Sequence, residues 1–200
     1  ADAMIAAQLV LGLVEPQSSG LGGGAFALYY DADQKRLSSI DARETAPGLA
    51  GPFLFYKDGQ ALGFKEAQLG GRSVGVPGVP KLLEQMHQAY GKLTWMELFE
   101  PAIDLAEHGF QVTPRLEGMI EAYAENLKNF DGAKGYLFTL DGQSLKRGDV
   151  LKNKDYAETL RDMAFSGSSA IYEGPLAEEI ESVVQNYAEN PGILTRQDLQ

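Results

Sequence analysis

The sequence predicts an α+β fold that is rich in helices and has a small antiparallel sheet. An apolar segment at residues 3–14 has the length of a buried helix, residues 25–30 and 36–42 form a strand pair, and helical periodicity dominates from residue 80 onward. This order of elements, a helix, a hairpin and then several helices, is typical of helices packed on a largely antiparallel sheet. Because two or three strands cannot form such a sheet alone, we infer that its remaining strands lie outside this chain.

The N-terminal part contains one predicted helix and one predicted hairpin. The helix at about 3–14 is apolar nearly all round, which predicts that both of its faces are buried, and Pro16 ends it. A glycine-rich segment at 18–24 follows. Residues 25–30 and 36–42, with a short polar connection between them, are typical of a hairpin.

The segment from Pro47 to Gly71 has no clear periodicity. Its glycines and prolines predict an irregular excursion that contains a short helix. Ser73 to Val76 is predicted as one more short strand, because valine alternates with smaller residues there.

Capping residues and apolar stripes then predict a helical layer. One helix begins at Pro80 and ends at Gly91, and a second opens with a capping box at Thr94–Glu97 and closes at Gly109. Pro101 implies a kink or an early break in the second helix. Three further helices are predicted from Thr113-Pro114 to Leu127, around Tyr156 to Met163, and from Gly174-Pro175 to Tyr187.

We expect residues 1–200 to be a single partial domain from a larger protein, truncated at both ends. Two hundred residues can bury one sizeable core. Ala1-Asp2-Ala3 has no basic region typical of a signal peptide, and the chain starts just inside the first helix. At the other end, Thr195 begins a cap-like sequence about one helical turn before Gln200.

Composition excludes several classes of function. The net charge of −11 argues against nucleic acid and anionic membranes as partners, since both require clustered Lys and Arg. No apolar run reaches the roughly 18 residues that cross a bilayer, so no membrane span is expected. The chain has no cysteine, which excludes disulfides, thiolate zinc sites and a cysteine nucleophile.

Two glycine-containing motifs have a chemical interpretation and a structural one. Gly20 to Gly24 favours a tight turn or a close backbone approach to a neighbour or substrate over a phosphate cradle, because here the glycines follow a helix and precede a strand, the reverse of the nucleotide-binding order. Gly71-Arg-Ser-Val-Gly75 matches the G-x-S-x-G elbow of serine hydrolases. An elbow requires a helix directly after Ser73, whereas a strand and a turn are predicted, so a chance match is favoured.

The sequence predicts no metal site and no cofactor. His87 and His108 are not part of a His-Glu-x-x-His motif, and the chain has no cysteine that could join them as a zinc ligand. Glu100, Asp104 and Glu107 lie at helical spacing and are interpreted as an exposed helix face.

Arg43 is the candidate binding residue. It stands at the end of a predicted strand, and a guanidinium there can hold a carboxylate with two parallel hydrogen bonds. The alternative, from spacing alone, is a structural salt bridge to Asp41 or Glu44.

Taken in order along the chain, several segments resemble the γ-glutamyltranspeptidase family. They are Asp2-Ala3 with Val14 to Gly20, Leu21 to Phe26, Asp41 to Pro47, Ser73 to Gly78, Tyr90 to Lys92, Pro101 to Ile103, Leu105 to Phe110, Tyr172 to Gly174, and Leu194 to Leu199. Each segment alone is a weak signal, whereas the ordered set is specific.

The resemblance implies part of an αββα N-terminal nucleophile hydrolase sandwich, from the large subunit of a precursor that cleaves itself. The new N-terminal Thr of the small subunit is then the nucleophile, and its own α-amine is the base. The implied reaction attacks a γ-glutamyl amide such as glutathione and passes the γ-glutamyl group to water or an acceptor amine. It needs no cofactor. The family also implies a periplasmic or secreted location.

In this family the arginine of the Asp41–Pro47 motif binds the α-carboxylate of the γ-glutamyl group, so the resemblance assigns substrate binding to Arg43, with Glu44 orienting it.

No catalytic residue is expected in this chain. Ala1 has no hydroxyl, and no threonine is followed by the Thr-His-type sequence of the family's cleavage point. The threonines are Thr45, Thr94, Thr113, Thr139, Thr159 and Thr195. We therefore expect the isolated chain to be inactive, with the small subunit as its partner. A β-lactam (cephalosporin) acylase and a non-catalytic partner-binding domain remain as alternatives.

Overall fold

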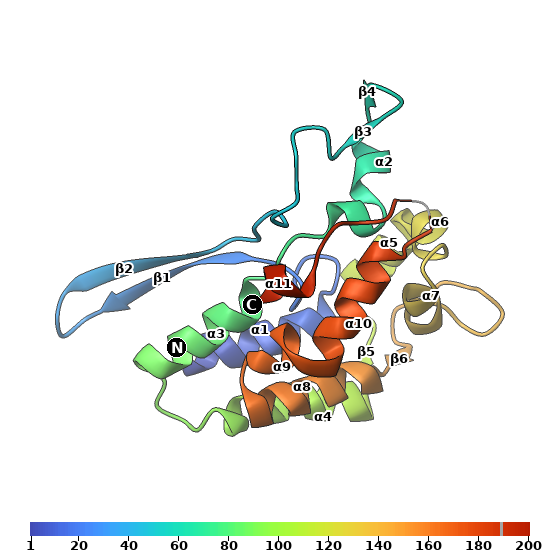
Figure 1. Cartoon of the computed structure of the whole chain (residues 1–200). Coiled ribbons are helices and arrows are strands. Elements are labelled where there is room, and N and C mark those ends of the chain that lie inside the picture. The colour runs from blue at the N-terminus through green and yellow to red at the C-terminus, as the bar shows by residue number, and fades with distance from the viewer. Residues whose placement is uncertain (189) are drawn as a thin grey trace. The chain divides into compact units, whose positions relative to one another are not determined.

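A computed structural model describes residues 1–188 and 190–200 as a helix-rich chain with short antiparallel strands (Figure 1). The α-helices are α1 (Asp2–Val14), α2 (Phe64–Gln68), α3 (Val79–Tyr90), α4 (Glu100–His108), α5 (Pro114–Ala122), α6 (Ala124–Leu127), α7 (Asp131–Leu137), α8 (Lys154–Ser166), α9 (Ser169–Tyr172), α10 (Gly174–Gln185) and α11 (Arg196–Leu199). Two 3-10 helices are η1 (Gly71–Ser73) and η2 (Met96–Leu98). The strands are β1 (Ala25–Asp31), β2 (Arg36–Ala42), β3 (Tyr56–Lys57), β4 (Gln60–Ala61), β5 (Phe110–Gln111) and β6 (Val150–Leu151).

The chain divides into two compact units. The first unit contains residues 1–20 and 86–165, and the second contains residues 21–85 and 166–200. That the 200 residues form a single partial domain stays a prediction.

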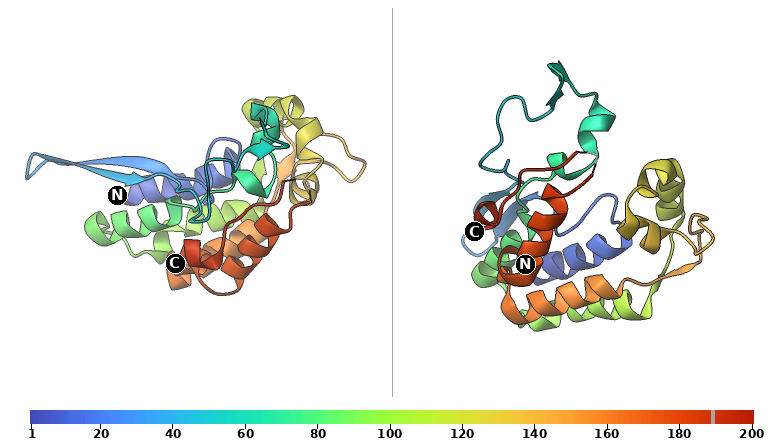
Figure 2. Two further views of the ribbon diagram at one scale, coloured as in Figure 1. Left: turned by 45° about the horizontal axis from the view of Figure 1, so that its top comes forward. Right: turned by 45° about the vertical axis from the view of Figure 1, so that its right-hand side comes forward.

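The core of the first unit forms around α1, which packs along α4 (Figure 2). Ile5, Leu9 and Leu13 recur every four residues and are buried, so they lie on one helix face. The prediction that both faces of this helix are buried is wrong, because Met4 and Leu11 are 37% and 41% exposed. The fully buried side of α1 is the one that carries Ile5, Leu9 and Leu13.

Two half-buried tyrosines donate hydrogen bonds to carbonyls in the second half of α1. The Tyr156 hydroxyl donates to the Leu9 carbonyl at 2.9 Å, and the Tyr136 hydroxyl donates to the Leu13 carbonyl at 3.3 Å. Burial raises the pKa of both hydroxyls, to about 12 for Tyr136. Both therefore remain protonated donors at neutral pH.

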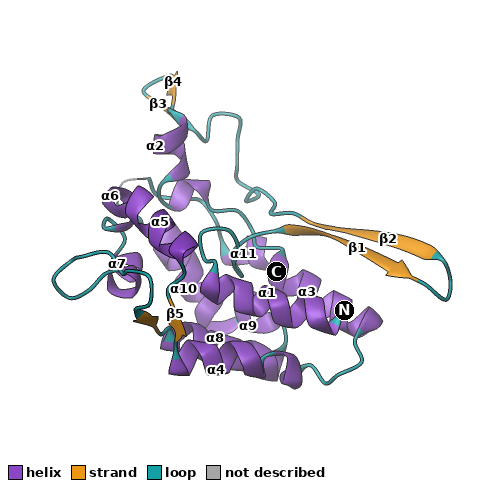
Figure 3. Cartoon of the chain, turned by 180° about the vertical axis from the view of Figure 1, so that it is seen from behind, coloured by secondary structure: helices purple, strands orange, loops and turns teal. Residues whose placement is uncertain are grey.

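The second unit contains the predicted hairpin, drawn as a long two-stranded ribbon in Figure 3. β1 pairs with β2 in an antiparallel register that runs from Ala25 opposite Ala42 to Asp31 opposite Arg36. The Asp31 carboxylate accepts hydrogen bonds from two backbone N–H groups of the turn. Alternate residues of this ribbon are exposed, including large apolar ones.

Two predictions about strands need correction or addition. The predicted strand at Ser73–Val76 is wrong, because Ser73 ends η1 and only an isolated bridge joins Val76 to Thr45. The irregular excursion between Pro47 and Gly71 is confirmed and contains α2 as its short helix, together with the small β3–β4 hairpin that the sequence did not predict.

Most of the predicted helices are confirmed. α3, α8 and α10 lie where their apolar stripes indicated, and Thr113 caps α5 by accepting from the Leu116 N–H. The Thr195–Asp198 capping box opens α11. Pro101 breaks the helix as expected, since η2 precedes it and it lies in the first turn of α4. Leu127, expected to continue α5, lies in the separate α6, and α7 and α9 were not predicted.

None of the described helices combines the length and the apolar character that a membrane span needs.

Candidate functional site

Arg43 lies directly after the last residue of β2. The backbone N–H of Arg43 donates to Asp41 Oδ1 at 2.9 Å, so the Asp41 carboxylate holds the main chain as it leaves the strand. The β1–β2 register ends at the preceding pair, Ala25 and Ala42. The strand end therefore fixes the position from which the guanidinium extends.

Arg43 lines a pocket of about 430 Å³ within the second unit. The lining residues are Gly22, Arg43, Glu44, Ser73, Val74 and Gly75. They come from three segments that are far apart in the sequence, at 20–24, 41–47 and 73–78. All three belong to the ordered set of motifs, so the fold brings separate motifs to one site.

Backbone hydrogen bonds hold the three segments together. The Val76 N–H donates to the Thr45 carbonyl at 2.9 Å. The N–H groups of Gly78 and Val79 both donate to the Gly23 carbonyl, at 2.9 and 3.0 Å. The three segments that line the pocket are therefore connected by main-chain hydrogen bonds, which do not depend on side-chain chemistry.

Two glycines allow this close approach. A Cβ atom on Gly24 would lie 2.4 Å from the Glu44 backbone nitrogen, and one on Gly75 would lie 2.9 Å from the Thr45 carbonyl oxygen. Larger residues at either position would push the segments apart. The glycines of these motifs therefore serve packing at the site.

The Arg43 guanidinium forms an ion pair with Glu44, with 3.2 Å between Nε and Oε2. Of the two salt bridges considered from the sequence, the one to Glu44 is present. Asp41 instead accepts a hydrogen bond from the backbone N–H of Arg43. The Arg43 side chain is 69% exposed, so the ion pair contributes only about 0–1 kcal/mol to stability. Among the described residues, the ion pair occupies Nε and leaves the two Nη groups available to a planar anion.

The Glu44 carboxylate is held in its charged form. Its pKa is lowered, and the largest cause is the backbone N–H of Glu44 itself; partial burial opposes this effect, and the Gly24 N–H and the Arg43 charge add to it. Oε2 makes no hydrogen bond of good geometry with the described residues, so these groups act as nearby dipoles and charge. A charged Glu44 can orient Arg43 at neutral pH.

Ser73 does not have the geometry of a nucleophile. Its hydroxyl donates to the carbonyls of Gln68 and Gly70, at 2.9 and 3.1 Å. No helix follows it directly, because η1 ends at Ser73 and α3 begins at Val79. The two histidines lie in the first unit, where His87 contacts the Leu93 carbonyl and His108 pairs with Asp104. These contacts do not support the serine hydrolase hypothesis.

The acidic residues of α4 lie on an exposed or half-exposed face. Asp104 pairs with His108, and Glu107 pairs with Arg161. In the part of the chain that the structure describes, no group of three or more His, Cys, Asp or Glu residues is arranged to hold a metal ion.

The sequence pointed to Arg43, with Glu44 orienting it, and Ser73 was weighed as a nucleophile, but no role was assigned to the other three lining residues. Gly22, Val74 and Gly75 offer main-chain groups and shape rather than charged side chains, so residue chemistry alone gave no signal for them. The available signal was the density of glycine in both segments, which indicates close backbone approach.

Comparison with known proteins gives consistent results. A family model described as gamma-glutamyltranspeptidase matches residues 1–200. The glutathione hydrolase proenzyme of Bacillus subtilis (strain 168) is 38% identical over 200 residues, which are 100% of this chain and 33% of that protein. The chain therefore spans about a third of the length of that relative.

Solved structures are also similar. The gamma-glutamyltranspeptidase of Helicobacter pylori aligns with a TM-score of 0.92 and 31% identity, covering 99% of this chain and 56% of that one. A cephalosporin acylase from Bacillus halodurans aligns with a TM-score of 0.82 and 30% identity, covering 99% of this chain and 37% of that one.

Proposed function

Because this chain belongs to the gamma-glutamyltranspeptidase family, we propose that it is part of an enzyme that cleaves γ-glutamyl amides and transfers the γ-glutamyl group to water or an acceptor amine. Its membership confirms the resemblance recognised in the sequence, and its structural neighbours confirm the predicted fold class, a helix-rich N-terminal nucleophile hydrolase. Relatives named glutathione hydrolase make glutathione the first substrate to test.

The observation that carries this proposal is the position of Arg43. Arg43 lines a pocket built from three separate motifs, and Glu44 engages its Nε while its Nη groups have no partner among the described residues. Two parallel N–H groups match the two oxygens of a carboxylate. We assign to Arg43 the binding of the substrate's α-carboxylate. This contact would hold the γ-amide at a fixed distance from the guanidinium.

We assign the nucleophile to a threonine on a small subunit from the same precursor. Of the lining residues only Ser73 carries a hydroxyl, and that hydroxyl donates to backbone carbonyls. In this scheme the threonine hydroxyl attacks the γ-carbonyl and its own α-amine accepts the hydroxyl proton. The C–N bond of the γ-amide then breaks, the α-ammonium protonates the substrate's leaving amine, and a γ-glutamyl ester of the threonine remains. Water or an acceptor amine then releases the γ-glutamyl group. The present chain supplies binding and is inactive alone.

The test compares the complete protein with this chain. The complete protein should release product from a chromogenic γ-glutamyl amide and separate into two polypeptides, while the 200-residue chain should do neither. Turnover by the isolated chain would contradict the assignment of the nucleophile. A complete protein that neither cleaves itself nor turns over substrate would instead support a non-catalytic, partner-binding domain.

A cephalosporin acylase is a second candidate, because such an enzyme is among the similar structures. The two activities differ in what Arg43 can recognise. A γ-glutamyl group carries an α-carboxylate next to its amine, and a guanidinium fork at Arg43 favours substrates with that group. Comparing kcat/KM for a γ-glutamyl amide and for a cephalosporin whose acyl side chain carries no carboxylate would decide between them.

We propose a periplasmic or secreted location from family membership. Fractionation of cells that express the complete protein would test it, and activity confined to the cytoplasmic fraction would contradict it.

A further inference from the structure

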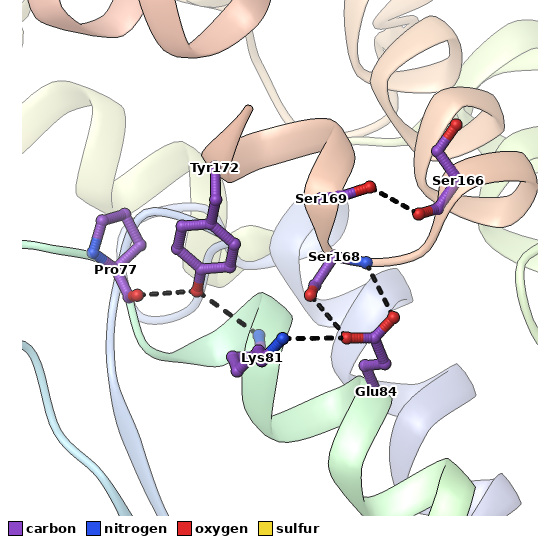
Figure 4. Close-up of polar contacts among 7 residues, drawn as sticks. All are labelled: Pro77, Lys81, Glu84, Ser166, Ser168, Ser169 and Tyr172. Atoms are coloured by element: carbon purple, nitrogen blue, oxygen red, sulfur yellow. Dashed lines mark hydrogen bonds and ion pairs between the residues drawn. The ribbon is translucent and has the colours of Figure 1, made fainter. Parts of the chain in front are cut away.

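The hydroxyl of Tyr172, the last residue of α9, makes two hydrogen bonds. It donates to the Pro77 carbonyl at 2.7 Å and accepts from the Lys81 N–H at 3.4 Å (Figure 4). The first bond joins α9 to the segment that carries Val74 and Gly75. The second satisfies a first-turn N–H of α3, which has no partner within its own helix.

Pro77 lies near the end of the segment 73–78, whose first three residues line the pocket. On one side of it, Val76 is bridged to Thr45, and on the other side Gly78 donates to the Gly23 carbonyl. The Tyr172 hydroxyl therefore fixes a carbonyl that lies between these two connections, one to the segment of Arg43 and Glu44 and the other to the segment of Gly22. A shift of Pro77 would move Gly75 relative to the Arg43–Glu44 pair.

The tyrosine ring is anchored independently of its hydroxyl. Tyr172 packs together with Val74 and Val76 against a buried cluster. The members of that cluster are Ala177, Val184, Leu194 and Leu199. Removing only the hydroxyl should keep this packing, so the hydrogen bond can be tested apart from the core.

A second polar group holds α9 against α3. The Glu84 carboxylate accepts from Ser168 Oγ at 2.6 Å and from the Ser168 N–H at 3.3 Å, and it pairs with Lys81 Nζ at 3.4 Å (Figure 4). Ser168 is 1% exposed. Because this serine directly precedes α9, the contact fixes the helix that carries Tyr172.

We propose that Tyr172 is a positioning residue for the Arg43 pocket, acting through the Pro77 carbonyl on the wall formed by residues 73–78. This inference rests on the proposed function of Arg43. Tyr172 touches no substrate in this account, and its effect is on the affinity for the carboxylate rather than on bond cleavage. The motif Tyr172 to Gly174 thereby gains a role that residue chemistry alone did not indicate.

The test is Tyr172→Phe in the complete protein, with Tyr156→Phe as the matched control. Tyr156, like Tyr172, is half-buried and donates to a backbone carbonyl, but it lies in the first unit. Loss of one such hydrogen bond should raise KM for a γ-glutamyl amide roughly three- to tenfold in Tyr172→Phe, with kcat within about twofold. Tyr156→Phe should lower thermal stability similarly and leave KM unchanged.

A double-mutant cycle separates this inference from the proposed function. If Tyr172 acts through the Arg43 pocket, Tyr172→Phe should raise KM by less than about twofold once Arg43→Lys is present. Two outcomes would overturn the inference about Tyr172 but leave the proposed function standing. In the first, the KM of the double variant rises by the full product of the two single effects. In the second, Arg43→Lys raises KM while Tyr172→Phe leaves it unchanged. An unchanged KM in Arg43→Lys would overturn the proposed function, and the inference with it.

Ser168→Ala supplies a second variant should Tyr172→Phe yield no folded protein. It removes the Oγ bond to Glu84 and loosens α9 while leaving the Tyr172 hydroxyl in place. A smaller rise in KM, again without loss of kcat, is expected. A KM equal to that of the unaltered protein would overturn the inference.

Discussion

The Nε atom of Arg43 lies 3.2 Å from Oε2 of Glu44, and both residues line the same pocket. This ion pair was the structural alternative to a binding role for Arg43, yet its geometry is compatible with binding. It engages one edge of the guanidinium and restricts its rotation, while the Nη edge keeps the fork that fits a carboxylate. A structural contact and a proposed binding contact can thus share one side chain.

Glu44→Gln tests this orienting effect. Removing the charge should raise KM for a γ-glutamyl amide roughly two- to fivefold, in line with the modest energy of exposed ion pairs. Because the pKa of Glu44 is lowered, the difference from the unaltered protein should be constant at neutral pH and shrink only below about pH 4.5. Steady-state kinetics across pH would check this. The control Glu179→Gln, on the exposed face of α10, should leave KM unchanged. If the KM difference between Glu44→Gln and the unaltered protein were already lost near pH 7, the orienting role of Glu44 would be contradicted.

Asp198→Asn should destabilise the chain by about 1–2 kcal/mol, because this carboxylate completes the α11 capping box and accepts from the Gly48 N–H at 2.7 Å. Its pKa is lowered, first by the Gly48 N–H and then by Thr195. A lowered pKa means that the stabilisation is present above the ordinary value of 3.8 and is lost as the pH falls through the folded value. Urea denaturation at neutral and acid pH measures this. Asp33→Asn in the hairpin turn is the control, and an equal loss of stability there would contradict the assignment.

Leu9→Ala should cost about 2–5 kcal/mol, since Leu9 is fully buried on the inner face of α1. Leu11→Ala, on the exposed side of the same helix, should cost less than about 1 kcal/mol. The pair tests the finding that only one face of α1 is covered. Comparable losses in denaturant unfolding would show that the outer face is buried as well.

The isolated chain should self-associate through the β1–β2 hairpin. Phe26, Leu28 and Tyr30 lie on one face of β1 and are 69%, 73% and 60% exposed. An apolar strand with unpaired edges is prone to such association. Light scattering should show oligomers that Leu28→Lys reduces and that Ala32→Lys in the turn leaves unchanged. A monomer across the concentration range would contradict this prediction.

Elements with strong local signals were predictable from the sequence. The hairpin follows from two alternating runs, and α5 follows from Thr113-Pro114, because such patterns act over a few residues. The valines at 74 and 76 misled the prediction of a strand. Their alternation serves packing against the buried cluster of the second unit, and only Val76 has a bridge partner.

The candidate site was predictable only in part. Arg43 was singled out from its chemistry and from the resemblance, but the pocket depends on three segments that are separated by at least about twenty residues. Their contact depends on hydrogen bonds such as that from Gly78 to Gly23, which have no local signature. The contribution of Tyr172 was hidden for the same reason, because its partner Pro77 is 95 residues away.

The central claim is that Arg43 binds the α-carboxylate of a γ-glutamyl group, and Arg43→Lys in the complete protein tests it most directly. Lysine keeps the charge but loses the fork, so KM for a γ-glutamyl amide should rise roughly 10- to 100-fold. Arg36→Lys, on the same hairpin, should leave KM unchanged. A KM for Arg43→Lys equal to that of the unaltered protein would contradict the claim.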